Sequence, residues 1–104
     1  TDNPDERERL AAALGTNHAL FLRNHGIVVT GSSVREAFER TRDLMTACEI
    51  QLALEAATDN IVEVPDAVCE STVRQLELHD SGRGKADWPA WRRLMDEVAP
   101  GYAD

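Results

Sequence analysis

The sequence has few cysteines, few basic residues and no long apolar run. Neither of its two cysteines, Cys48 and Cys69, lies in a Cys-x-x-Cys or another spacing typical of metal sites. Lys and Arg number 11 against 19 Asp and Glu, which gives a formal net charge of −8. Nucleic-acid phosphates are bound by clustered basic side chains, and a membrane-spanning helix needs roughly 18 apolar residues. We therefore expect neither nucleic acid nor a membrane as a partner.

Both cysteines fall on the apolar faces of expected helices. This placement favours small, buried hydrophobic residues in a reduced, cytoplasmic protein, with a disulfide or a catalytic thiol as the alternatives. Residues 1–9 are polar and highly charged, so we expect no signal or transit peptide there. The length of 104 residues suits one small domain.

Two apolar runs, residues 18–23 and residues 27–30, predict a pair of strands around an Asn-His-Gly corner. Both runs are apolar at nearly every position, which is typical of a sheet covered on both faces. An isolated pair of strands is marginally stable in water, and residues 60–64 are the only other candidate strand. We therefore expect that the chain lacks part of its sheet or borrows strands from a partner.

The remaining sequence predicts four helices. The first spans about residues 5–14, the second runs to about Ala57, and the third spans about residues 66–79. Ser33 and Glu36 have the spacing of a capping box at the start of the second helix. A loop follows over residues 81–84, and Asp87 is then expected to cap the fourth helix, with Pro89 in its first turn. The stripes expected to face inward include Val34, Phe38, Leu44, Met45, Leu52, Val73, Leu76, Trp91, Leu94, Met95 and Val98.

Several segments together resemble the C-terminal half of the class II aldolase/adducin family. The core of the resemblance is residues 22–31, Leu-Arg-Asn-His-Gly-Ile-Val-Val-Thr-Gly, supported by Leu14-Gly15, Ala37-Phe38 and residues 47–52. Residues 87–96 and 100–102 resemble the terminal segment of a bacterial branch with decarboxylase-like members. The resemblance implies an α/β fold, the C-terminal portion of a three-layer α/β/α domain that is helix-rich with one strand pair. Residues 1–104 would form a single, incomplete domain.

The chemistry of the family implies a divalent metal, most often zinc, held by three histidines. Two belong to a His-x-His pair and the third to the Asn-His-Gly corner, while an upstream glutamate acts as acid and base. The cation offsets charge that develops as a carbon–carbon bond breaks or forms. In this sequence only His25 falls on a ligand position. The pair, the glutamate and the phosphate-binding residues would precede Thr1.

Other positions carry weaker implications. Tyr102 matches a C-terminal aromatic residue that, in some members, reaches a neighbouring subunit's active site as a proton donor; the alternative is a disordered tail residue. Met45 stands where much of the family has a glutamate. Taken without the family, His25 is a turn residue, and His18 and His79 are ordinary polar residues. Three helix carboxylates are most simply solvated: Glu49, Glu55 and Glu70.

These observations lead us to expect the C-terminal segment of a metal-dependent class II aldolase-type lyase or decarboxylase. Its substrate would be a small hydroxylated or carboxylated molecule, and the segment alone would be inactive. The resemblance favours a cytoplasmic homo-oligomer, in particular a tetramer. One alternative is an adducin-like, non-catalytic interaction module. Another is a helical domain that matches by chance, with His25 on an exposed hairpin that has no further strands beside it.

Overall fold

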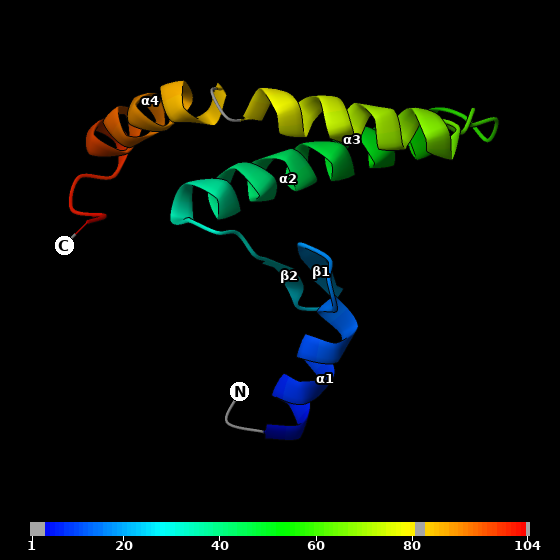
Figure 1. Ribbon diagram of the computed structural model, residues 1–104, viewed down its shortest axis with the longest axis horizontal. Coiled ribbons are helices and arrows are strands. Elements are labelled where there is room, and N and C mark those ends of the chain that lie inside the picture. Colours follow the sequence, from blue (N-terminus) through cyan, green and yellow to red (C-terminus); the bar gives the residue numbers. More distant parts are fainter. Residues whose placement is uncertain (1–3, 81–82, 104) are drawn as a thin grey trace. The chain divides into compact units, whose positions relative to one another are not determined.

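The computed structural model describes the backbone of residues 4–80 and 83–103, and the side chains of residues 4–76 and 87–103. The elements, shown in Figure 1, are α1 (Pro4–Leu14), β1 (Ala19–Leu22), β2 (Gly26–Val29), α2 (Val34–Ala57), α3 (Asp66–Asp80) and α4 (Arg83–Val98). Two compact units divide the chain, Thr1–Thr46 and Ala47–Asp104. The first therefore holds α1, the strands and the first half of α2.

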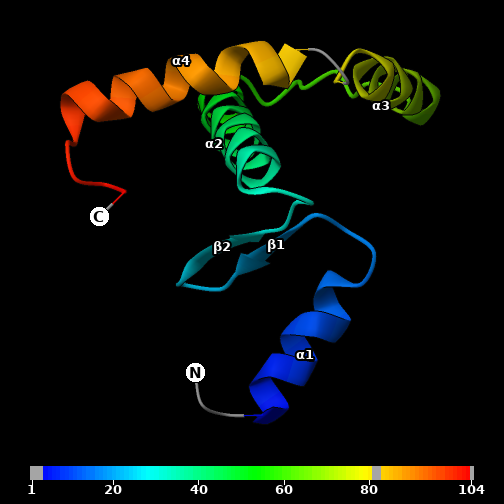
Figure 2. The ribbon, with the colours of Figure 1, turned by 60° about the vertical axis from the view of Figure 1, so that its left-hand side comes forward.

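The predicted strand pair is confirmed. β1 and β2 are antiparallel, with Ala19 opposite Val29 and Leu22 opposite Gly26, and Figure 2 shows them as a narrow ribbon. Beyond this ladder, the Thr30 amide donates to the His18 carbonyl at 2.9 Å. The candidate strand at residues 60–64 is wrong, since that segment is irregular. Within the described residues the sheet therefore has two strands.

The three helices predicted before residue 80 are confirmed, but the inward-facing stripes are not buried. No described side chain is buried; Phe21 in β1 is 64% exposed and Val34 in α2 is 79% exposed. The cysteines follow the same rule, because Cys48 is half-buried and Cys69 is exposed, and both are free. An amphipathic face is buried only where another element packs on it. The spacing of the apolar residues correctly predicts helices. The described part of the chain, however, supplies too few packing elements to cover their apolar faces.

The start of the fourth helix is also corrected. The helix begins at Arg83, one turn before the expected cap Asp87, and Pro89 lies inside it. Of the loop expected at residues 81–84, Arg83 and Gly84 belong to the helix, and residues 81 and 82 lie outside the described part. Pro89 cannot donate to a carbonyl one turn earlier, which disfavours this arrangement. Arg83, Lys85 and Ala86 favour a helix and extend it before Asp87 despite Pro89 and despite Gly84, which is a weak helix former.

The connection from β2 to α2 contains the predicted capping box. The Ser33 hydroxyl accepts a hydrogen bond from the Glu36 amide at 3.2 Å. The Glu36 carboxylate reaches back, but it accepts from the Ser32 amide rather than from the cap residue itself. Both bonds satisfy amides that have no partner within the helix. The first turn of α2 is thus tied to the chain leaving the hairpin.

Removing the cap hydroxyl should measurably destabilise this junction. We expect Ser33→Ala to lower the free energy of unfolding by about 1 kcal/mol, because the Glu36 amide loses its acceptor. Ser33→Asp is the matched control, since aspartate caps as well as serine, and should remain close to the wild type. Urea denaturation followed by circular dichroism measures both. Equal stability of the alanine and wild-type proteins would contradict the capping role.

The same junction should make stability depend on pH. Hydrogen bonds from the Ser32 hydroxyl and amide, aided by the positive charge of Arg40, hold the pKa of Glu36 below its usual value of 4.5. A carboxyl whose pKa is lowered on folding contributes stability above its unfolded pKa, and this contribution is lost as pH falls through the folded pKa. We expect Glu36→Gln to flatten the decline in unfolding free energy between roughly pH 5 and pH 3.

The matched control for this experiment is Glu39→Gln, which removes a carboxylate that pairs with Arg35 one turn away on α2. It should leave the pH dependence steep. Identical pH profiles for Glu36→Gln and the wild type would show that the Ser32 contacts do not stabilise the ionised form.

Candidate functional site

The Asn-His-Gly corner is the tip of the hairpin. Residues 23–25 connect the paired residues Leu22 and Gly26, and the His25 amide donates to the Leu22 carbonyl at 3.1 Å. Asn24 adopts a left-handed conformation with φ of 57°, and Gly26 has φ of 148°. Asparagine tolerates the first conformation, and the second is nearly restricted to glycine. The residue types on either side of His25 are therefore those that the tip requires.

A cleft of about 560 Å³ lies between α1 and the hairpin, and His25 lines it. All of its lining residues belong to the first unit. They are Glu6, Arg9, Leu10, Ala13, Leu20, Phe21, Leu22, Arg23 and His25. The lining thus combines apolar residues of α1 and β1 with a carboxylate, two guanidinium groups and an imidazole.

The hairpin separates its two histidines. His18 lies at the open end, where its carbonyl bonds Thr30, whereas His25 lies at the tip. Four strand residues between them span roughly 13 Å at about 3.3 Å per residue. Two imidazole nitrogens that bind one zinc ion must each lie about 2 Å from it. His18 and His25 therefore do not share an ion in this arrangement, and both are exposed.

The described residues do not complete a metal site. Among them, no three His, Cys, Asp or Glu side chains gather closely enough to hold an ion. His79 lies on α3, and its side chain is outside the described part. Structural and catalytic zinc sites use three or four protein ligands. His25 alone is thus one potential ligand, and the fit of a cation depends on residues beyond these.

Tyr102 follows α4 and folds back on it. Its amide donates to the Ala99 carbonyl at 3.1 Å, and Gly101 takes a φ of 95° that permits the turn. A hydrogen bond with the Tyr102 side chain, aided by the negative charge of Asp96, raises the pKa of Arg92. Tyr102 is 45% exposed. Its proposed reach into a neighbouring subunit stays a prediction.

The helix carboxylates lie where a solvated face was expected. Glu49, Glu55 and Glu70 are all exposed. Glu55 accepts from Gln51 at 2.7 Å, and Glu70 lies 3.8 Å from Arg74, in both cases one turn away on the same helix. Met45 is 49% exposed.

The sequence did not predict the contribution of α1 to the cleft. The charged residues of α1 gave no signal that they face the hairpin.

Comparison with known proteins assigns the family. Residues 1–52, half of the chain, match the profile described as the Class II Aldolase and Adducin N-terminal domain. The chain therefore belongs to the class II aldolase/adducin family, and a chance resemblance of a helical domain is excluded. His25 lies on an exposed hairpin, as a chance match would also predict. Exposure of the hairpin alone therefore does not distinguish a family member from a chance match.

Three curated relatives are each 36% identical to this chain. A putative aldolase class 2 protein of Caulobacter vibrioides matches 98% of the chain and 40% of its own length. Alpha-adducin of Rattus norvegicus matches 85% of the chain and 13% of its own length. Decarboxylase NovR of Streptomyces niveus matches 88% and 32%. The chain thus spans well under half the length of these relatives.

No solved structure matches the chain significantly. Within the described residues, no helix is long and apolar enough to cross a membrane.

Proposed function

We propose that this chain is the C-terminal segment of a metal-dependent class II aldolase-type lyase or decarboxylase. The observation that supports this most is the placement of His25. It lies at a hairpin tip shaped by Asn24 and Gly26, lines the cleft beside α1, and falls within the segment matched by the family profile. Its substrate is proposed to be a small hydroxylated or carboxylated molecule.

In this proposal His25 supplies one ligand to a divalent cation, most often zinc in this family, and the other ligands come from residues that precede Thr1. Among the described residues, no three potential ligands gather closely enough to hold the cation. No catalytic step is therefore assigned to this chain by itself. What the chain contributes is one imidazole, with charged groups of Glu6, Arg9 and Arg23 around the same cleft.

The domain is proposed to be a single, incomplete one over residues 1–104, part of a three-layer α/β/α domain. Incomplete cover of the strands supports this, since no residue of β1 or β2 is buried and Phe21 is 64% exposed, and isolated strand pairs are marginally stable. Open strand edges and apolar surface also favour association. We propose a cytoplasmic homo-oligomer, a tetramer by family resemblance, with Tyr102 as a candidate proton donor.

Replacing His25 in the complete protein should remove the bound metal. We expect His25→Ala to reduce zinc per protomer from about one to nearly none after dialysis, because losing one ligand of three leaves too few for tight binding. The matched control is His18→Ala, which alters the other histidine of the same hairpin. Elemental analysis by mass spectrometry measures the metal content of each protein.

This pair of variants gives a clear contradiction as well. If His25→Ala retains the zinc content of the wild type, His25 is not a ligand and the proposed function is wrong. If His18→Ala loses zinc as fully as His25→Ala, the two histidines are not separated in the complete protein as this hairpin separates them.

The segment by itself should be inactive. We expect residues 1–104 to show no carbon–carbon cleavage and no decarboxylation of small hydroxy and keto acids, with or without added zinc, because three of the four expected chemical groups are absent. The complete protein assayed on the same panel is the positive control. Metal-dependent turnover by the segment would show that the upstream half is unnecessary.

A second candidate function is an adducin-like, non-catalytic interaction module. It is favoured by the identity of 36% over 94 residues with alpha-adducin and by Met45 at a position where many members have glutamate. The coding sequence before Thr1 discriminates the two. A His-x-His pair and a glutamate there support the enzyme, and their replacement supports the interaction module.

A further inference from the structure

The hairpin is joined to α2 by a short connection. Only residues 31–33 separate Thr30 from the first residue of α2. No Cα atom of β1 or β2 lies within 8 Å of a Cα atom of α2, so the backbones of these described elements do not pack directly. The direction in which the hairpin leaves α2 must therefore depend on the contacts of the connection and on side chains that cross it.

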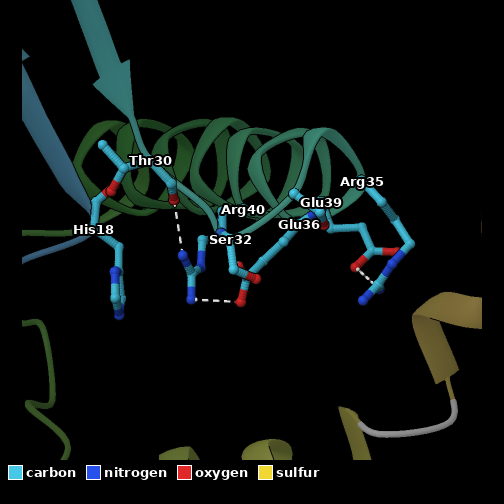
Figure 3. Close-up of polar contacts among 8 residues, drawn as sticks. His18, Thr30, Ser32, Arg35, Glu36, Glu39 and Arg40 are labelled. Carbon is cyan, nitrogen blue, oxygen red and sulfur yellow. Dashed lines mark hydrogen bonds and ion pairs between the residues drawn. The ribbon is translucent and has the colours of Figure 1, made fainter.

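Arg40 and Glu36 form such a bridge, shown in Figure 3. One guanidinium nitrogen, Nη1, donates to the Thr30 carbonyl at 2.8 Å, and the other, Nη2, pairs with Glu36 Oε1 at 2.8 Å. The second Glu36 oxygen accepts from the Ser32 amide. Two side chains of α2 thus hold Thr30, just before the connection, and Ser32 within it. Both are half-buried, at 30% and 22% exposure.

Gly31 shows how tightly the connection approaches the helix. A Cβ atom at this position would lie 2.6 Å from the Ala37 amide nitrogen and 3.1 Å from its Cα. Backbone atoms of a helix cannot move aside as a flexible side chain can. Only glycine therefore allows the Thr30 carbonyl to approach Arg40 in this way.

We propose that Arg40, together with Glu36, is a positioning residue that fixes the direction of the hairpin and thereby the place of the His25 corner. This inference rests on the proposed role of His25 as a metal ligand. The corner lies roughly 13 Å along the strands from Thr30. A rotation of about 10° at the bridge moves it by roughly 2 Å, whereas a working site needs its groups placed within about 0.5 Å.

The test compares Arg40→Met with a matched control, Arg35→Met, in the complete protein. Arg35 also pairs with a glutamate one turn away, Glu39, at 2.8 Å, but this pair lies within α2. Zinc affinity is measured by competition with a chelator, well below the melting temperature of each variant. We expect Arg40→Met to bind zinc about tenfold more weakly and Arg35→Met to stay within about twofold of the wild type. Wild-type affinity in Arg40→Met would overturn the proposal.

A metal-free measurement separates this proposal from the proposed function. Spin labels at Arg23→Cys and Asp43→Cys, with Cys48, Cys69 and any other cysteine replaced by serine, report the distance between the hairpin tip and α2. Adding Arg40→Met should broaden the distance distribution, and adding Arg35→Met should not. An unchanged distribution in Arg40→Met would overturn the positioning role. If His25→Ala binds zinc as well as the wild type does, the proposed function is overturned instead.

Discussion

Two strands that are apolar at nearly every position need cover on both faces, and this requirement governs the rest of the structure. β1 and β2 pair with each other and take α1 on one side, yet no described side chain becomes buried. The family relatives extend well beyond the length matched by this chain. Open strands, a single candidate metal ligand and partial coverage of the relatives are consistent with one another. All three fit the proposal that residues 1–104 form part of a larger domain.

Local chemistry was sufficient to predict most of the elements. The capping box at Ser33 and Glu36 fixed the start of α2, because those side chains satisfy nearby amides whatever surrounds them. The strand pair followed from its β-branched and aromatic residues, and the Asn-His-Gly tip from residues that tolerate unusual φ. The start of α4 was missed, since Asp87 and Pro89 form a plausible cap and first turn, but the residues before them continue the helix.

Properties that depend on neighbours could not be predicted in this way. Helical spacing identified the stripes of α2 and α4, but Val34 is 79% exposed and Val98 63% exposed, because exposure is decided by what packs on a face. His25 was identified from the corner and the family, whereas the cleft it lines requires α1 to lie beside the strands. The sequence predicts only one of the two contacts that Arg40 makes. Its spacing from Glu36 suits a helix pair, but its bond to Thr30 depends on how the chain turns at Gly31.

The central claim is that His25 is one ligand of a divalent cation in the complete protein. The most direct test is a crystal structure of that protein grown with zinc, with diffraction measured on both sides of the zinc absorption edge. The account predicts an anomalous peak about 2.0–2.1 Å from an imidazole nitrogen of His25, with two further histidines from outside this chain. A zinc peak elsewhere, with the His25 ring in solvent, would contradict it.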